Sequence, residues 1–286
     1  MRDFFFHRPN SIEEALAILR EHGEDARAMA GGTAIVNLMK QSLLFANHIV
    51  SLQDVPGMRD ISLENGDLHI GALVKQQDVV TSPTVSEHAP LLSEVYRRVA
   101  TIKVRNMATV GGGLAHADPA QDPPPALMIL GATVRLVSER GERILPVEDL
   151  FRDYYETAID SDEILTEVIV PQSDQSAKSV YLKFLPRTAD DYATVGVTAS
   201  VRLEDGRCDD VRVALNSVAP TPVRATAVED ALKGRTASEG TLREASELVR
   251  QYLDPLDDFR GSAEYKRDMA VVFTYRALMQ TTGLAQ

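Results

Sequence analysis

The chain is expected to be organised around one stretch, TIKVRNMATVGGGLAHADPAQD, at residues 101–122. It contains three consecutive glycines, Gly111 to Gly113, preceded by Thr109 and followed by Asp118 and Asp122. Glycine has no Cβ and tolerates positive φ, so backbone N–H groups in such a segment can approach a ligand closely. Successive N–H groups in a turn form a concave anion site, which suits a phosphate. Three glycines also occur in plain turns, so this stretch alone leaves both interpretations open.

A second glycine segment, AGGTAI at residues 30–35, repeats this chemistry with Gly31, Gly32 and Thr33. A short apolar stretch precedes it and a helix-compatible run, residues 34–40, follows. A strand, a glycine turn and a helix N-terminus form a common anion site. Neither segment fits GxGxxG or GxxxxGK[ST], which excludes the dinucleotide Rossmann and P-loop patterns. Two such turns are expected to hold a diphosphate from both sides.

Composition limits the class of protein. With 286 residues, 44% hydrophobic and 25% charged, the chain is large enough for two or three packed subdomains. Its net charge of −12 argues against nucleic acid or an anionic membrane surface as a partner, since both need a basic face. A diphosphate must therefore be held mainly by backbone N–H groups and not by a lysine cluster.

The ends and the cysteine content indicate the compartment. The N-terminal sequence MRDFFFHRP has no signal-peptide pattern, and no run approaches the roughly eighteen apolar residues of a membrane span. We therefore expect a cytoplasmic protein. Cys208, the single cysteine, cannot form an intrachain disulfide, an iron–sulfur cluster or a zinc site, so we interpret it as an incidental thiol. No catalytic residue and no metal ligand is predicted in this chain.

Hydrophobic patterns and turn signals predict three units, at residues 1–56, 57–172 and 178–286. The first alternates strands and helices in the order β–α–β–α–β, and a capping box at Ser11 and Glu14 opens its first helix. The expected elements are strands at 4–6, 26–30 and 48–52 and helices at 11–19 and 34–40.

The second unit is predicted to be α+β, and the third to be an antiparallel sheet followed by helices. An Asn65-Gly66 turn signals a hairpin in the second unit. Clean alternation over 195–203 indicates a half-exposed antiparallel strand in the third. The expected strands are 61–64, 68–70, 133–137, 143–145, 164–170, 180–185, 195–203 and 211–215; the expected helices are 90–100, 126–130, 225–233, 239–253 and 262–280.

Three segments in the same order resemble the FAD-binding medium subunit (subunit M) of molybdenum hydroxylases. They are AGGTAI, then TIKVRNMATVGGGLAHADPAQDPPPALMILGA, then KFLPRTADDYATV. This is the family of aerobic carbon monoxide dehydrogenase and of the corresponding middle region of xanthine dehydrogenase, and the resemblance covers nearly the whole chain. It implies an α+β fold: a two-part FAD-binding domain of the vanillyl-alcohol-oxidase/PCMH type, then a C-terminal domain with an antiparallel sheet and helices.

The resemblance also implies an electron-transfer function and two partners. A large subunit would carry molybdopterin and a small subunit two [2Fe–2S] clusters, in a dimer of heterotrimers. This chain would take electrons from the clusters and pass them through FAD to an external acceptor. One alternative is a self-sufficient FAD-dependent oxidoreductase of the same FAD-domain type. Another is a non-enzymatic nucleotide-binding protein that uses the same turns.

The implied cofactor-binding residues include both glycine segments as diphosphate binders. In the family, the position of Gly113 is often asparagine, and the position of Ala34 is often acidic or polar, so these two contacts depart from the family pattern. The full predicted set is Ala30, Gly31, Gly32, Thr33, Ala34, Ile35, Thr109, Gly111, Gly112, Gly113, Asp122, Leu165, Lys183 and Tyr192.

Four single residues have implied roles, each with a structural alternative. Asp122 contacts FAD hydroxyls or caps a helix. Lys183 lies near the pyrimidine edge of the flavin or is a solvated lysine. Leu165 touches the cofactor or is plain core. Tyr192 stacks over the isoalloxazine ring or is a core tyrosine at a strand end.

The remaining polar residues near these segments carry weaker expectations. We interpret His116 and Asp118 as a structural pair rather than a catalytic one. Asp190 and Asp191 either shape the loop before Tyr192 or are solvated acids, and Arg187 is a possible ion-pair partner for one of them.

Overall fold

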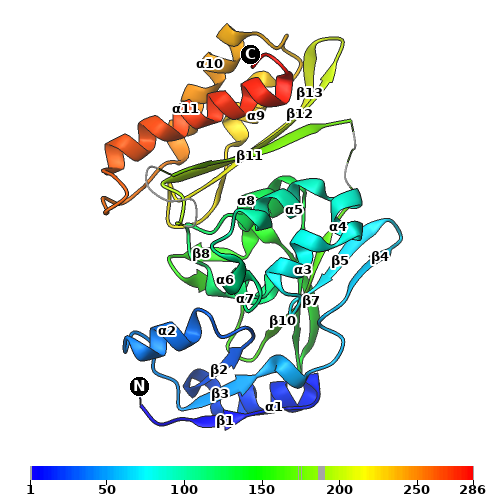
Figure 1. Ribbon diagram of the computed structural model, residues 1–286, viewed down its shortest axis with the longest axis vertical. Coiled ribbons are helices and arrows are strands. Elements are labelled where there is room, and N and C mark those ends of the chain that lie inside the picture. Colours follow the sequence, from blue (N-terminus) through cyan, green and yellow to red (C-terminus); the bar gives the residue numbers. More distant parts are fainter. Residues whose placement is uncertain (1, 173, 175, 186–190, 286) are drawn as a thin grey trace.

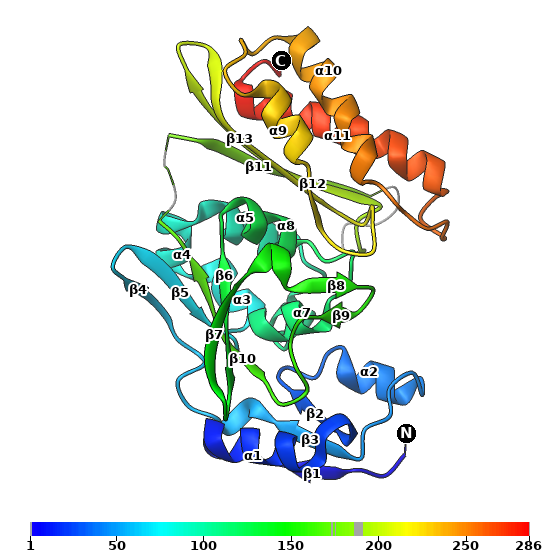
Figure 2. The same ribbon diagram turned by 180° about the vertical axis from the view of Figure 1, so that it is seen from behind.

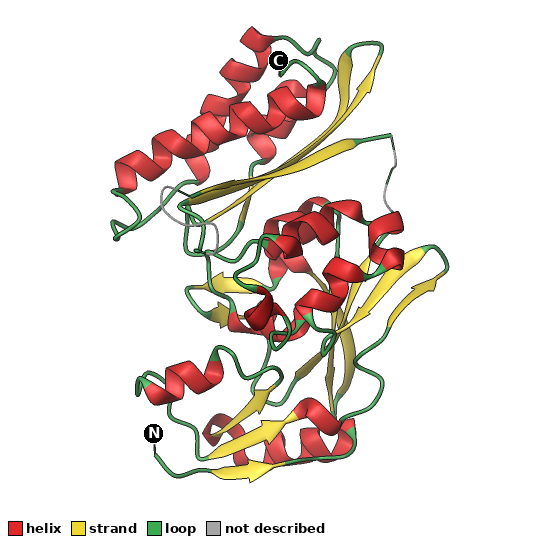
Figure 3. Cartoon of the chain, viewed as in Figure 1, coloured by secondary structure: helices red, strands yellow, loops and turns green. Residues whose placement is uncertain are grey.

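The computed structural model describes residues 2–172, 174, 176–185 and 191–285, so Arg187 and Asp190 lie outside the described residues. Three sheets follow one another along the long axis of the molecule (Figure 1). The N-terminal sheet lies at one end and the C-terminal sheet with its helices at the other. A five-stranded sheet with several helices lies between them, as Figure 3 shows by element type.

The N-terminal sheet is parallel, with strand order β1-β3-β2. The predicted β–α–β–α–β order is therefore confirmed. Ser11 Oγ accepts the Glu14 N–H at 3.2 Å and so caps the first helix, which buries Leu16 and Leu19 and continues to His22, beyond the predicted end. The elements are β1 (Phe5–His7), α1 (Ile12–His22), β2 (Ala26–Met29), α2 (Ile35–Lys40) and β3 (His48–Ser51).

The middle sheet is antiparallel, with order β4-β5-β10-β6-β7. Asn65 and Gly66 both have positive φ, as the predicted hairpin turn requires. Val134, Leu136 and Val168 are fully buried, and helices pack over the sheet (Figures 1 and 2). The strands are β4 (Ile61–Glu64), β5 (Asp67–Gly71), β6 (Thr133–Ser138), β7 (Gly141–Pro146) and β10 (Ile164–Val170), with a small pair β8 (Phe151–Asp153) and β9 (Glu156–Thr157) beside them.

The helices of the middle part include four short ones that the sequence did not predict as helices, and two of them lie in the central stretch, residues 101–122. These are α6 (Ile102–Arg105) and α7 (Val110–His116), and α7 contains all three glycines of the central stretch. The prediction of a glycine turn there is wrong. The predicted helix 90–100 ends earlier, at Arg97. The others are α3 (Gln76–Thr81), α4 (Pro83–His88), α5 (Pro90–Arg97) and α8 (Pro123–Ile129).

The C-terminal sheet is antiparallel, with order β11-β12-β13-β14, and is covered on both faces. Helix α11 packs on one face, while α8 of the middle part contacts β12 and β13 from the other (Figure 1). Consequently Val195 to Ala199 are all buried, and the prediction of a half-exposed strand is wrong there, whereas from Ser200 to Arg202 the burial alternates as predicted. The elements are β11 (Lys178–Phe184), β12 (Val195–Glu204), β13 (Arg207–Asn216), β14 (Val223–Arg224), α9 (Thr226–Leu232), α10 (Glu239–Glu247) and α11 (Ala263–Thr282).

Two further predictions concern the length of a C-terminal helix and the presence of membrane spans. The predicted helix 239–253 is shorter, because α10 ends at Glu247 and a 3₁₀ turn, Leu248–Tyr252, follows. Among the described ranges, no helix is both long enough and apolar enough to cross a membrane.

Candidate functional site

The two glycine segments lie against each other where the N-terminal and middle parts meet. A Cβ on Gly31 would lie 2.0 Å from the carbonyl oxygen of Met107, and one on Gly112 would lie 3.3 Å from the Cβ of Ala30. The Ala30 carbonyl is fixed by Gln53, whose Nε2 donates to it at 2.7 Å. The fold therefore brings together the two segments that the sequence singled out, with no side chain between their closest atoms.

The first segment presents unused donors. Within the described part of the chain, none of the five N–H groups from Gly31 to Ile35 donates a hydrogen bond. Its carbonyls are used: Gly32 accepts from Val36 at 3.2 Å, and Thr33 accepts from the side chain of Asn37 at 2.9 Å. Half-buried N–H groups need a partner, and five of them at the start of a helix form a site for an anion.

The second segment, in contrast, has no unused donors in its first turn. The N–H groups of Val110 and Gly111 donate to the carbonyls of Val74 and Ala72, at 3.0 and 2.9 Å. Thr109 is the N-cap: its Oγ1 accepts from Gly112 at 3.1 Å, and its carbonyl accepts from Gly113 at 3.0 Å. The expectation that this segment offers free N–H groups is therefore wrong.

Glycine at position 111 is needed for packing. A Cβ there would lie 2.4 Å from the Cβ of Ala72 and 3.0 Å from its Cα. Such distances are too short for any contact between carbon atoms, so the helix could not approach the end of β5 this closely with another residue. At Gly111, the missing side chain thus lets α7 dock on the middle sheet.

Two glutamines occupy the space beside Gly113 that an asparagine side chain would enter. A Cβ on Gly113 would lie 3.1 Å from Gln121 Oε1 and 3.3 Å from Gln76 Nε2. Gln121 Nε2 donates to the Gly113 carbonyl at 2.8 Å, and Gln76 Oε1 is buried without a hydrogen bond among the described residues. Sequence reasoning missed both glutamines, because neither stands in a recognisable motif.

A lysine also borders the contact between the two segments. Lys75 Nζ donates at 3.3 Å to the Met107 carbonyl, the same oxygen that Gly31 faces. Burial lowers the pKa of Lys75, and the nearby Arg59 lowers it further. The carboxylate of Asp78 counteracts part of this shift, and an anion bound beside Lys75 would counteract more of it. Sequence reasoning missed this residue as well.

Asp122 and Lys183 form a buried ion pair. Lys183 Nζ lies 2.8 Å from Asp122 Oδ2 and 2.9 Å from the carbonyl of Arg98, and Asp122 Oδ1 accepts from the hydroxyl of Tyr181. Both side chains are at most 5% exposed. Burial raises the pKa of Asp122, and the cation of Lys183 counteracts it.

This ion pair decides between two of the alternatives posed from the sequence. Asp122 stands at the N-cap position of α8, but its side chain makes no cap hydrogen bond. Lys183 is not solvated. The helix-cap and solvated-lysine alternatives are therefore wrong, and Tyr181 is a partner that the sequence did not predict.

Leu165 and Tyr192 lie in opposite environments. Leu165 is 6% exposed in β10, opposite Leu136, and belongs to the core of the middle part. Tyr192 is 51% exposed, so it is not a core tyrosine. Partial burial together with the charge of Asp118 raises the pKa of Tyr192. Its ring is thus available on the surface beside an acid.

Four side chains gather near the C-terminal end of α7, and we call them the tyrosine cluster: His116, Asp118, Tyr155 and Tyr192. Tyr155 donates to Asp118 Oδ2 at 3.3 Å, and its ring centroid lies 5.2 Å from that of His116. Burial lowers the pKa of His116, so its ring is neutral at pH 7. Asp118 therefore bonds to Tyr155, a residue that sequence reasoning missed, and no direct His116–Asp118 bond is found among the described residues.

Two family models cover most of the chain. Residues 2–173 match the FAD binding domain in molybdopterin dehydrogenase, and residues 180–281 match the CO dehydrogenase flavoprotein C-terminal domain. The carbon monoxide dehydrogenase medium chain of Afipia carboxidovorans is 34% identical over 99% of this chain and 98% of its own. A putative xanthine dehydrogenase FAD-binding subunit of Escherichia coli is 27% identical over 98% and 96%.

Solved structures agree with these matches over the whole length. Carbon monoxide dehydrogenase from Hydrogenophaga pseudoflava superposes with a TM-score of 0.96 at 33% identity, covering 100% of this chain and 99% of that one. Quinoline 2-oxidoreductase from Pseudomonas putida 86 gives 0.93 at 31%, covering 99% and 98%. The predicted fold class is therefore confirmed: an α+β FAD-binding domain followed by a C-terminal domain with an antiparallel sheet.

Proposed function

The chain belongs to the FAD-binding medium subunits of carbon monoxide dehydrogenase- and xanthine dehydrogenase-type molybdenum hydroxylases, and from this we propose that it is the electron-transfer subunit of such a complex. It would take electrons from the [2Fe–2S] clusters of a small partner subunit and pass them to an external acceptor. FAD, when bound, supplies the capacity to accept electrons singly or in pairs. The residues of this chain would hold and orient it.

The five unused N–H groups of Gly31 to Ile35 are the observation that supports the proposal most directly. They would donate to the oxygens of the FAD diphosphate, and Lys75 adds a positive charge at the edge of the site. The first turn of α7 packs against the same segment, but its N–H groups are already bonded within the chain, so it would add no donor. Thr109, Gly112 and Gly113 would shape the site by leaving room rather than by donating.

The tyrosine cluster would receive the flavin ring. Helix α7 has seven residues and is therefore about 10 Å long. A ligand whose diphosphate lies at the start of α7 would then place its ring near the far end. Tyr192 is free to stack on a ring there, and Tyr155 and His116 would line its edge.

Asp122 and Lys183 would act as a unit beside the ligand. Asp122 already accepts from Lys183 and Tyr181, but a carboxylate has further acceptor positions for a hydroxyl of the FAD chain. Lys183 would hold Asp122 ionised and oriented. Its charge is already paired, so its direct influence on the pyrimidine edge would be weak. Leu165 would contribute only as core behind the site.

The proposed partners follow from the relatives. The similar proteins are medium chains of carbon monoxide dehydrogenases, and one solved relative is a Cu,Mo-CO dehydrogenase. We propose a large molybdopterin subunit and a small iron–sulfur subunit for this chain too, in a dimer of heterotrimers. The substrate would be oxidised on the large subunit, so its identity depends on a different polypeptide.

A matched pair of glycine variants tests the function. Gly32 and Gly57 both have positive φ, +76° and +78°, and a Cβ at either meets no described atom closer than 3.6 Å. Gly32→Ala and Gly57→Ala should each cost about 1–2 kcal/mol of stability. Only Gly32→Ala should also weaken FAD binding, by about tenfold or more, because its strained loop would relax and its N–H groups would no longer converge.

The readout is the flavin absorption spectrum and a titration of the purified full chain with FAD. The unmodified chain should bind one FAD. A yellow, FAD-saturated Gly32→Ala protein with unchanged affinity would contradict the proposed site, and a chain that binds ADP but no flavin would contradict the function.

Tyr192→Ala tests the flavin end of the site. Because Tyr192 is half exposed, its loss should change stability by less than about 0.5 kcal/mol. It should shift the flavin absorption envelope and change the rate of reoxidation by a small acceptor. Tyr265→Ala, another exposed tyrosine, serves as the control. An unchanged spectrum and unchanged reoxidation in Tyr192→Ala would remove this residue from the site.

A further inference from the structure

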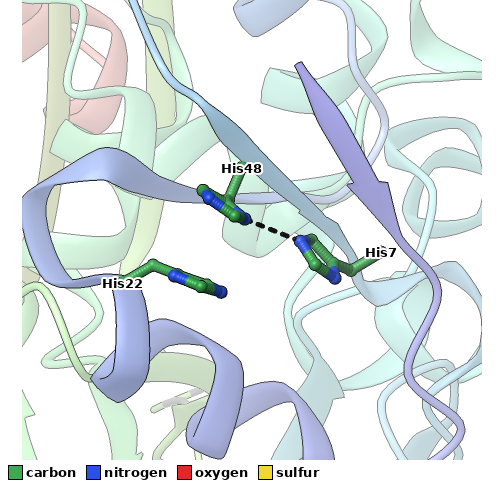
Figure 4. Close-up of side chains that lie close together, drawn as sticks. All are labelled: His7, His22 and His48. Carbon is green, nitrogen blue, oxygen red and sulfur yellow. Dashed lines mark hydrogen bonds between the residues drawn. The ribbon is translucent and has the colours of Figure 1, made fainter.

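Three histidines from three different elements converge on the N-terminal sheet. His7 ends β1, His22 is the last residue of α1, and His48 begins β3. All three side chains are half-buried. One ring nitrogen from each histidine lies within 4.8 Å of one ring nitrogen of each of the other two (Figure 4). They make up half of the six histidines in the chain. We call them the histidine cluster.

The fold produces this cluster through strand pairing. β1 and β3 are parallel neighbours, with Phe5 opposite His48 and His7 two residues further along. Helix α1 packs on the same sheet, and its last turn brings His22 beside His48. No local spacing in the sequence could show this, because each histidine comes from a separate element.

Two of the three rings, those of His7 and His48, already direct a nitrogen at each other. His7 Nε2 lies 2.9 Å from His48 Nδ1, so a single proton lies between the two nitrogens (Figure 4). His22 stacks on His48 with ring centroids 3.6 Å apart and planes 15° apart. A face-to-face stack does not aim both rings at one ion, so His22 would have to turn about its side-chain bonds to complete a site.

We propose that the histidine cluster binds one divalent transition-metal ion of the zinc class. Zn–N distances are about 2.0–2.1 Å, so a tetrahedral ion that replaces the shared proton needs His7 Nε2 and His48 Nδ1 about 3.4 Å apart. That is an opening of about half an ångström from the observed 2.9 Å. His22, the last residue of α1 and half-buried, would turn to supply the third nitrogen.

The chemistry of the surroundings selects the type of ion. Three imidazoles suit Zn²⁺, Cu²⁺ or Ni²⁺, and they do not suit Mg²⁺ or Ca²⁺, which prefer oxygen ligands. Three protein ligands leave a fourth position for water. The ion would join β1, α1 and β3, and it requires no contact with FAD.

A zinc titration tests the proposal. The full chain, expressed without a polyhistidine tag and freed of metal with a chelator, is titrated with zinc sulfate in a calorimeter. One ion per chain should bind in the micromolar range or tighter. Each of His22→Gln and His48→Gln should weaken binding by about tenfold or more, equivalent to about 1.4 kcal/mol. His88→Gln, a histidine on α4 outside the cluster, should leave it unchanged.

Two further measurements make each outcome decisive. Circular dichroism and FAD content confirm that the variants are folded; if His48→Gln does not fold, His22→Gln at the helix end gives the answer. Cobalt(II) bound in place of zinc should show the strong visible bands of a tetrahedral nitrogen site. Binding only at millimolar zinc, equal binding by all variants, or a cobalt spectrum like that of the hydrated ion would overturn the proposal.

Discussion

The two glycine segments of this protein have similar sequences, but their backbone N–H groups are in opposite hydrogen-bonding states. From Gly31 to Ile35, no N–H group has a partner among the described residues, whereas those of Val110 to Gly113 are all bonded within the chain. The first segment can therefore donate hydrogen bonds to a ligand. The second segment instead lets α7 pack closely against Ala72 and Ala30. The comparison teaches that a glycine motif indicates a possible site, and that accounting for each N–H shows what the motif does.

The second segment is helical because its capping and its packing against the middle sheet stabilise a helix there. Three consecutive glycines disfavour a helix by about 1 kcal/mol each relative to alanine. The Thr109 cap, the buried side chains of Val110 and Leu114, and the close contact with Ala72 offset that cost. Gly111→Ala should therefore affect stability first, whereas Gly32→Ala, where a Cβ meets no described atom closer than 3.6 Å, should affect FAD binding first.

Gly111→Ala should lower stability more than any other variant proposed for this chain. Its Cβ would lie 2.4 Å from the Cβ of Ala72, so α7 would have to move, at a cost of about 2–3 kcal/mol. Gly240→Ala on α10 is the matched control, since a Cβ there meets no described atom within 4 Å, and it should stabilise slightly. Urea unfolding of both variants without FAD measures this. Equal stability of the two would contradict the packing role.

A smaller effect is expected for Thr109→Val. It removes the acceptor of the Gly112 N–H and should cost about 1–2 kcal/mol, because the cap is buried. Thr101→Val removes a similar cap from exposed α6 and should cost no more than about 0.5 kcal/mol. FAD affinity should change only a few-fold in both variants. Lost FAD binding at unchanged stability in Thr109→Val would mean that the second segment does supply ligand contacts.

Much of the fold could be predicted from local signals. The N-cap at Ser11 and the Asn65-Gly66 turn are short-range patterns whose physics depends on adjacent residues, and both occur as predicted. The Glu14 carboxylate accepts from the N–H of Asn10 instead of that of Ser11. The expected half-exposure failed over Val195 to Ala199, because burial of the second face there depends on α8, which is distant in sequence. Alternation of residues cannot report what covers a sheet.

The site could be predicted only where a motif marks it. The resemblance singled out both glycine segments, and the fold brings them together. The Asp122–Lys183 pair, Gln76, Lys75 and the histidine cluster join residues from separate elements, so no spacing in the sequence reveals them. Long-range contacts of this kind require the structure.

Amide hydrogen exchange with and without FAD is the most direct test of the central claim, that the first segment donates and the second does not. The amides of Gly31 to Ile35 should exchange rapidly without FAD and slowly once FAD is bound, while those of Val110 to Gly113 should be slow in both states. Slow exchange at Gly31 to Ile35 before FAD is added, or new protection confined to Val110 to Gly113 afterwards, would contradict it.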